Sequence, residues 1–303
     1  MDTSDLFIIG MDVGATKCRA KLCKFDLEPI QETTSLGANL FFDRDEAIKR
    51  IVSAIEKLLK NKAVRGIDPQ KILINMGVAG STLAENRERL RSAVDHLGQI
   101  SILPDYSVVS YGCLAGKDGG VVSMGTGAVT TVSGTDRLRP DVVSGGFGYP
   151  VSDLGAGAWI GLEAIRYSIL DEQKNDAQTP LTEQVLARFD GKLRSITRWS
   201  VNASAADYAA FAPLVSAAVK AGDTSAKYIL RSALDYVRIY IEQLNDRNCE
   251  TIVLSGGVGN MLLDVFPLEL QNSVSPPELD GAEGACMMVR DCYGDFNFSN
   301  THI

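Results

Sequence analysis

Histidine is nearly absent from this 303-residue sequence, which contains only His96 and His302. Hydrolases of the Ser/His/Asp type and three-histidine zinc enzymes need histidine at the reacting centre. The sequence therefore argues against both classes, and we expect any general base to be a carboxylate. His96 ends the helical pattern ENRERLRSAVDH and is expected at the surface or at a helix end.

Cysteine is sparse and scattered. No two cysteines have the Cys-x-x-Cys spacing typical of metal or redox sites, and a chain of this length does not depend on a disulfide framework. We expect free, mostly buried thiols in a reducing cytoplasm. The six cysteines are Cys18, Cys23, Cys113, Cys249, Cys286 and Cys292.

An excess of basic residues and long apolar runs are missing too. With 38 acidic and 30 basic residues the net charge is −8, which argues against a nucleic-acid partner. A small anionic ligand still fits, because backbone N–H groups bind phosphate locally. No run approaches the ~20 apolar residues of a membrane span, and the acidic start MDTSDLFIIG is unlike a secretory signal. We expect a cytoplasmic protein without a membrane partner.

The order of strand and helix patterns indicates two α/β domains. A single core rarely exceeds roughly 250–300 residues, which favours two domains at this length. Each half opens with an apolar strand, a glycine turn (DVGATK or MGTGAV) and a second strand, and helical periodicity follows. We place the domains at residues 1–117 and 118–303, on either side of a cleft. The last helix, GAEGACMMVRDCY, is expected to pack back on the first domain.

The first glycine turn can bind phosphate. Glycine at Gly14 lets the backbone approach an anion closely, and successive N–H groups at Gly14, Ala15 and Thr16 form an anion-binding concavity to which Lys17 can add charge. Asp12 precedes the turn and can hold Mg²⁺ through water. A plain hairpin turn with an exposed aspartate is the alternative interpretation.

Two further glycine segments extend the pattern. The turn Gly125-Thr126-Gly127 repeats the first arrangement in the second half. The segment Gly256-Gly257-Val258 follows an apolar strand, where small residues leave room for a base or ribose; a strand-to-helix turn is the alternative. Phosphate loops in both halves are typical of nucleotide hydrolysis or phosphoryl transfer, which predicts ATP as a ligand.

Five sequence blocks follow one another along residues 7–290 in the order GMDVGATKCRA, MGTGAV, GGFGYPVSDLGAGAWIG, LSGGVG and GAEGA. They resemble the BadF/BadG-type ATPase family of the actin-like superfamily, whose members include N-acetylglucosamine kinase and bacterial glucosamine kinase, and the third block is the most specific. The resemblance implies two ribonuclease H-like α/β domains, a homodimer, and ATP- and Mg²⁺-dependent transfer to the 6-hydroxyl of N-acetylglucosamine or glucosamine.

The resemblance also implies roles for single residues. Asp105 matches the family's catalytic aspartate and would accept the proton of the sugar hydroxyl. Asp153 and Asn39 match sugar-binding residues, and Gly80 matches a small residue that lines the sugar pocket. Read without the resemblance, Asp105 and Asn39 suit turns, and Asp153 suits the cap of the helix that contains Trp159.

Two departures from the family pattern keep other functions open. Leu154 and Ala156 stand where the family has Glu and Ser, and Val13 and Ala15 stand where glycines are common. A sugar- or nucleotide-binding regulator without catalysis is one alternative. An ATP-driven electron-transfer activator is another, although Cys113 is the only cysteine near the domain junction.

Overall fold

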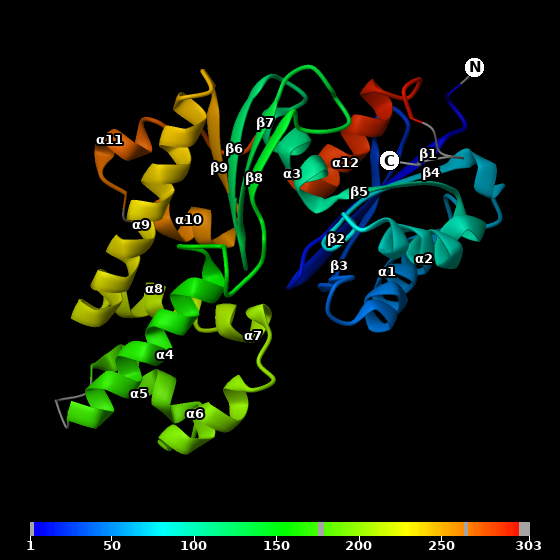
Figure 1. The fold of residues 1–303 in the computed structure, drawn as a ribbon. Helices are drawn as coiled ribbons and strands as arrows, with labels where there is room; N and C mark the ends of the chain where they lie inside the picture. The colour runs from blue at the N-terminus through cyan, green and yellow to red at the C-terminus, as the bar shows by residue number, and fades with distance from the viewer. Residues whose placement is uncertain (1–2, 175–178, 264–265, 297–303) are drawn as a thin grey trace. The chain divides into compact units, whose positions relative to one another are not determined.

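The computed structural model describes residues 3–174, 179–263 and 266–296, so His302 lies outside the described residues. The chain divides into two units (Figure 1). The first comprises the described residues of Met1–Gly119, Thr131–Val142 and Pro277–Ile303, and the second those of Gly120–Thr130 and Val143–Pro276. The sequence assigned residues 118–303 to the second domain and expected the last helix to pack on the first, whereas both Thr131–Val142 and the stretch from Pro277 onward belong to the first unit.

The first unit is built on a five-stranded sheet with the order β3-β2-β1-β4-β5. The predicted hairpin is confirmed, because β1 and β2 pair antiparallel around the first glycine turn. Strands β4 and β5 run parallel to β1. The strands are β1 (Phe7–Val13), β2 (Lys17–Lys24), β3 (Pro29–Leu36), β4 (Ile72–Val78) and β5 (Gln99–Pro104).

Helices cover both faces of this sheet, as Figure 1 shows. On one face Ile9, Met11 and Val13 share a hydrophobic core with α1 and α2. On the other face α3 and α12 pack against β1 and β4 and against each other. The helices of this unit are α1 (Arg44–Leu59), η1 (Pro69–Lys71), α2 (Ala84–Val94), η2 (Asp95–Leu97), α3 (Asp105–Leu114) and α12 (Gly281–Asp291).

Two glycines permit the close approach of α12. A Cβ atom at Gly10 on β1 would lie 2.4 Å from the carbonyl oxygen of Ala282, and one at Gly284 would lie 2.6 Å from the Cα atom of Gly112 on α3. Both distances are far below van der Waals contact, so only glycine fits. The small residues at the start of α12 therefore set how closely this helix packs on the sheet.

The second sheet has the order β8-β7-β6-β9, and β6 and β9 are parallel. Its strands are β6 (Gly119–Met124), β7 (Ala128–Ser133), β8 (Val142–Gly145) and β9 (Ile252–Ser255). The helices that follow are α4 (Gly157–Lys174), α5 (Pro180–Ala187), α6 (Leu193–Ser200), α7 (Ala205–Ala209), α8 (Ala212–Lys220), α9 (Thr224–Asn245), α10 (Gly257–Leu263) and α11 (Leu268–Gln271). The predicted class of two α/β units is confirmed.

Helical periodicity also accounts for the helical part of the second unit. Along α9 the buried residues Ile229, Leu230, Ala233 and Val237 recur at spacings of three and four. Its N-cap Asp223 accepts hydrogen bonds from Ala226 N (2.9 Å) and from Leu181 N (2.9 Å), so one carboxylate holds the starts of two helices. Among the described helices, none is long and apolar enough to cross a membrane.

Candidate active site

Three parallel strands of the first unit end at the same edge of the sheet. Because β1, β4 and β5 run in one direction, their carboxyl ends lie side by side. Asp12 stands at the end of β1, Gly80 follows β4, and Asp105 follows β5 directly as the first residue of α3. Ligands of open α/β sheets bind at this kind of edge.

Asp105 is a half-buried carboxylate that begins a helix. Its Oδ1 accepts a hydrogen bond from the backbone N of Tyr106 at 3.0 Å. Burial raises the pKa of Asp105 to about 6, although hydrogen bonds from the backbone of Tyr106 and of Asp105 itself partly offset this effect. The carboxylate can therefore lose and regain a proton close to neutral pH, as a general base must.

Asp12 lies close enough to Asp105 for the two carboxylates to repel each other. Burial raises the pKa of Asp12 to about 7, and repulsion from the carboxylates of Asp105 and Asp280 adds to the effect. The positive charges of Arg19 and Lys17 oppose it. Arg19 is the direct partner of Asp12 across the β1–β2 pair, which places both side chains on one face of the sheet.

This pair of carboxylates suits a magnesium ion. Mg²⁺ keeps several waters and is usually held by one or two carboxylates together with substrate phosphates. Two neighbouring carboxylates with raised pKa values meet that need, because a bound cation would relieve their repulsion. Within the described parts of the chain, no group of three or more His, Cys, Asp or Glu side chains forms a metal site of its own.

The first glycine turn is closed by its own backbone. Gly14 N donates to the carbonyl of Lys17 at 3.0 Å. Gly14 and Ala15 are half-buried, and the side chains of Thr16 and Lys17 are exposed. Gly37 packs under the turn, since a Cβ atom there would lie 2.4 Å from the Gly14 carbonyl oxygen. The turn thus packs against Gly37, and its tip, with Thr16 and Lys17, is exposed to solvent.

The structure brings Asn39 and Gly80 together. Gly80 has a φ of +81°, which favours glycine. A Cβ atom at Gly80 would lie 2.7 Å from Asn39 Oδ1. The same Oδ1 accepts a hydrogen bond from Phe41 N at 2.9 Å, which orients the amide. These two predicted sugar-pocket residues therefore lie side by side, although they are far apart in the sequence.

Sequence reasoning missed the start of α12 as part of this site. A Cβ atom at Gly281 would lie 2.8 Å from Asp12 Oδ2, so the helix begins directly against the Asp12 carboxylate. The sequence predicted the helix GAEGACMMVRDCY, and the motif D-x-x-E at Asp280–Glu283 also indicates its start. Nothing in the local sequence links that start to Asp12.

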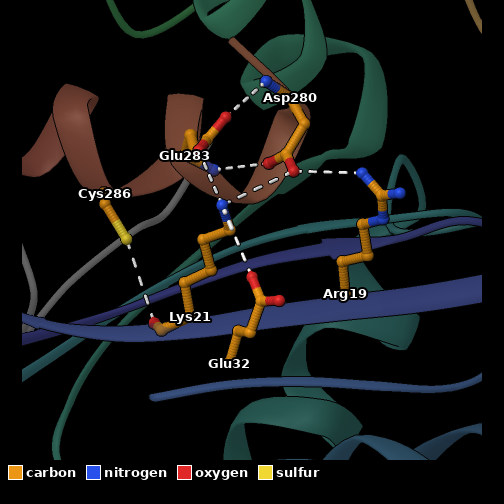
Figure 2. A network of polar contacts seen from close by, with 6 residues as sticks. All are labelled: Arg19, Lys21, Glu32, Asp280, Glu283 and Cys286. Carbon is orange, nitrogen blue, oxygen red and sulfur yellow. Dashed lines mark hydrogen bonds and ion pairs between the residues drawn. The ribbon is translucent and has the colours of Figure 1, made fainter. Parts of the chain in front are cut away.

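Ion pairs tie the start of α12 to strand β2 (Figure 2). Asp280 Oδ1 caps the helix by accepting from Glu283 N at 2.8 Å, and its Oδ2 accepts from Arg19 Nη1 at 3.0 Å. Lys21 Nζ donates to Glu283 Oε1 at 2.6 Å and also pairs with Glu32 at 3.7 Å. Both oxygens of Asp280 are thus engaged in holding the helix, which distinguishes it from Asp12 and Asp105.

In the second unit, Asp153 lies on the second glycine turn. A Cβ atom at Gly127 would lie 2.4 Å from Asp153 Oδ2. The backbone N–H of Ala128 hydrogen-bonds the Asp153 carboxylate, whereas burial, the larger effect, raises its pKa. Asp153 has a φ of +62°, and its buried Oδ1 has no hydrogen-bond partner in the described parts of the chain. A buried, unpartnered carboxylate oxygen of this kind is suited to a ligand hydroxyl.

The backbone of the second turn is fixed on both sides. The carbonyls of Gly125 and Thr126 accept from the N–H groups of Gly157 (2.9 Å) and Ala158 (3.0 Å), at the start of α4. Gly125 N also donates to Gly127 O at 2.9 Å. The turn and the helix start therefore form one rigid piece.

The third glycine segment lies next to the second turn. Gly256 has a φ of +92°, and a Cβ atom there would lie 2.2 Å from the carbonyl oxygen of Met124, the last residue of β6. Gly257 is exposed, whereas the side chain of Val258 is buried. Any contact of Val258 with a nucleotide would accordingly come from its backbone.

Comparisons with known proteins show the family and the fold of the chain. The model of the BadF/BadG/BcrA/BcrD ATPase family matches residues 9–289. Over 283 residues the chain is 26% identical to a glucosamine kinase of Vibrio cholerae, covering 93% of this chain and 95% of that protein. It is 24% identical over 264 residues to an N-acetylmuramic acid/N-acetylglucosamine kinase of Clostridium acetobutylicum, covering 83% and 84%. The crystal structure of a proposed N-acetylglucosamine kinase from Chromobacterium violaceum shares the fold, with a TM-score of 0.83, 24% identity, and 94% and 99% coverage.

Proposed function

Because the chain belongs to the BadF/BadG/BcrA/BcrD ATPase family, we propose that it is an ATP-dependent amino-sugar kinase. The observation that carries the proposal is the placement of Asp105 at the carboxyl edge of the first sheet, beside Asp12, with a pKa of about 6. The substrates that we propose are glucosamine or N-acetylglucosamine, phosphorylated on the 6-hydroxyl. The two curated kinases to which the chain is similar support this substrate class.

In the proposed reaction Asp105 acts as the general base. Its carboxylate accepts the proton of the sugar hydroxyl as the oxygen of that hydroxyl forms a bond to the γ-phosphorus of ATP and the bond to ADP breaks. Phosphoryl transfer needs mainly orientation and partial removal of this proton, so one carboxylate near its pKa is sufficient. Asp12 would hold Mg²⁺, which when bound neutralises charge on the phosphate oxygens.

The other residues position the two substrates. The backbones of Gly14–Lys17 and Gly125–Gly127 would contact the phosphates, and that of Gly256–Val258 the adenosine. Asn39 and the backbone at Gly80 would contact the sugar, as would the unpartnered Oδ1 of Asp153. Ala156 is fully buried, so the alanine that stands where the family has Ser affects the interior of the unit and not its exposed surface.

A coupled assay of ADP release tests the proposal. The purified chain is given ATP, Mg²⁺ and one sugar at a time from glucosamine, N-acetylglucosamine, N-acetylmuramic acid and glucose. We expect sugar-dependent ADP release with an amino sugar, and NMR of the product should show phosphorus coupled to the protons at carbon 6. ADP release that does not depend on any of these sugars would contradict the proposal.

A further inference from the structure

A small pocket in the first unit lies apart from the residues assigned above. It opens between α3 and the segment that joins β7 to β8. Ser107 and Tyr111 line it from α3, Lys117 from the turn after that helix, and Arg137 and Arg139 from the β7–β8 segment. None of the residues proposed for the sugar, the nucleotide or Mg²⁺ is among its lining residues.

The β7–β8 segment is held in place on α3. Leu138 packs against the hydrophobic cluster that α3 and α12 share. The carboxylate of Asp141 closes the segment, because it accepts from Thr135 N at 2.9 Å, from Thr135 Oγ1 at 2.6 Å and from Asp136 N at 3.2 Å. Arg137 and Arg139 are therefore carried by an ordered backbone, on either side of the anchored Leu138.

Positive charge gathers at this pocket on a chain whose net charge is −8. Within the described part of the chain, Arg137 and Arg139 form no ion pair, and Lys117 Nζ is 4.0 Å from the nearest carboxylate oxygen, on Glu278. Two carboxylates, of Asp118 and Asp136, also line the pocket. Asp136 Oδ1 already accepts from Leu138 N at 2.8 Å. The cationic side chains that line the pocket thus outnumber the anionic ones, and among the described residues no carboxylate pairs with Arg137 or Arg139.

One residue that lines the pocket has a buried hydroxyl. Ser107 is 1% exposed, and among the described residues its Oγ has no hydrogen-bond partner. A buried hydroxyl without a partner costs free energy, and native proteins pair such groups with protein, water or ligand. By contrast, Ser110 on the same helix is paired, since its Oγ contacts Ser133 Oγ at 2.9 Å.

We propose that this pocket binds a small oxyanion of the phosphate type. Arg137, Arg139 and Lys117 supply the positive charge, and the hydroxyl of Ser107 donates a hydrogen bond. Arginine is suited to this role because its planar guanidinium donates two parallel bonds to a phosphate. The anion can come from free phosphate or from the phosphate group of a phosphorylated sugar. Ser107 lies two residues after Asp105 on α3, so a ligand here contacts the helix that begins with the proposed base.

Calorimetric titration with inorganic phosphate tests the site. A saturating non-hydrolysable ATP analogue is present throughout, so that phosphate does not bind at the glycine turns. We expect one phosphate per chain in the parent, and at least about tenfold weaker binding in the R137Q/R139Q variant, the scale of two lost charge-assisted hydrogen bonds. The K62Q/R65Q variant is the matched control, because it removes two exposed positive charges elsewhere in the same unit.

Three results would overturn the proposal: no phosphate binding by the parent, an equal loss in both double variants, or unchanged binding in Ser107→Ala. The last variant should fold as well as the parent, since it removes an unpaired hydroxyl, and its melting temperature verifies this. Repeating the titration with glucosamine 6-phosphate on the parent and on R137Q/R139Q distinguishes the two sources, because binding that is tighter than that of inorganic phosphate and is lost in the double variant identifies a sugar phosphate at this pocket. Binding is measured without turnover, so the outcome is independent of the proposed kinase activity.

Discussion

At the scale of single residues, the first unit keeps Asp12 and Asp105 at one sheet edge with pKa values raised to about 7 and about 6. Burial is the main cause for both, and their mutual repulsion adds to it for Asp12. An ionised pair in this position is unfavourable for folding but useful for binding a cation and accepting a proton. Activity and stability should therefore respond to pH in opposite directions.

The pH dependence of activity follows from the base. Asp105 accepts a proton only when it is ionised, and protonation of Asp12 removes the proposed Mg²⁺ ligand. We expect kcat/KM to fall as the pH is lowered through about 7 to 6. Initial rates between pH 5 and 9, in buffers of constant ionic strength, measure this fall of kcat/KM on the acidic side of the pH profile. A profile that stays flat down to pH 5 would exclude both carboxylates from the rate.

The pH dependence of stability has the opposite sign. The pKa of Asp105 is about 6 in the folded chain, above its ordinary value of 3.8, so between these values the folded chain binds more protons. Stability therefore falls as pH rises through this window. Asp105→Asn should be more stable than the parent at pH 7.5, by ~1–2 kcal/mol, and the difference should shrink at pH 4.5. Urea unfolding at the two pH values measures it; a variant that is less stable at pH 7.5 would contradict the assigned burial.

The second glycine turn allows a comparison of two neighbouring positions. A Cβ atom at Gly127 would lie 2.4 Å from Asp153 Oδ2, whereas one at Gly125 would meet nothing within 4 Å. Gly127→Ala should cost about 1–3 kcal/mol, the usual cost of overpacking, and Gly125→Ala much less. Urea unfolding of the two variants compares the costs directly. Equal costs would mean that Asp153 does not lie on the turn.

At the scale of elements, α12 acts as a fixed support for Asp12. The capping box of Asp280 and Glu283 and the ion pairs with Arg19 and Lys21 hold its first turn against strand β2. A Cβ atom at Gly281 would lie 2.8 Å from the Asp12 carboxylate. A side chain at this position must displace either the carboxylate or the helix.

This support predicts a selective loss in Gly281→Ala. The added methyl group moves Asp12, so kcat should fall by about tenfold or more, the scale of a misplaced catalytic group, and the concentration of Mg²⁺ needed for half-maximal rate should rise. The KM for the sugar should change little. Gly294→Ala is the control, because a Cβ atom there meets no atom of the described residues within 4 Å. Equal kinetics in the two variants would remove α12 from the site.

Local signals predicted the elements well. The glycine turn between two alternating strands gave the β1–β2 hairpin. Read by itself Asp105 suited a turn, and its turn-like surroundings concealed that it follows β5 directly and begins α3. The close approach of Asp153 to Gly127 and of Gly281 to Asp12 could not be predicted. Both depend on tertiary packing, and the local sequence of one segment does not indicate which other segment it packs against.

At the scale of the whole molecule, the chain leaves the first unit and returns to it twice. The segment Thr131–Val142 and the stretch from Pro277 onward both belong to the first unit. Arg19 and Asp280, for example, are 261 residues apart in the sequence and form a hydrogen bond of 3.0 Å. Periodicity and turn chemistry are local, so the sequence supplied a single boundary near residue 117 and missed the interleaved segment. The proposed function depends on this return, since α12 supports Asp12.

The turnover of Asp105→Asn tests the kinase mechanism most directly. The amide keeps the shape of the side chain and can still hydrogen-bond the sugar hydroxyl, but it cannot take the proton. With the amino sugar that the parent uses best, we expect kcat to fall about 10²–10⁴-fold, the usual scale for loss of a general base. Calorimetry should show that sugar and ATP bind nearly as tightly as in the parent. A variant that retains most of the parent kcat would contradict the account, because the proton would then leave the sugar without Asp105.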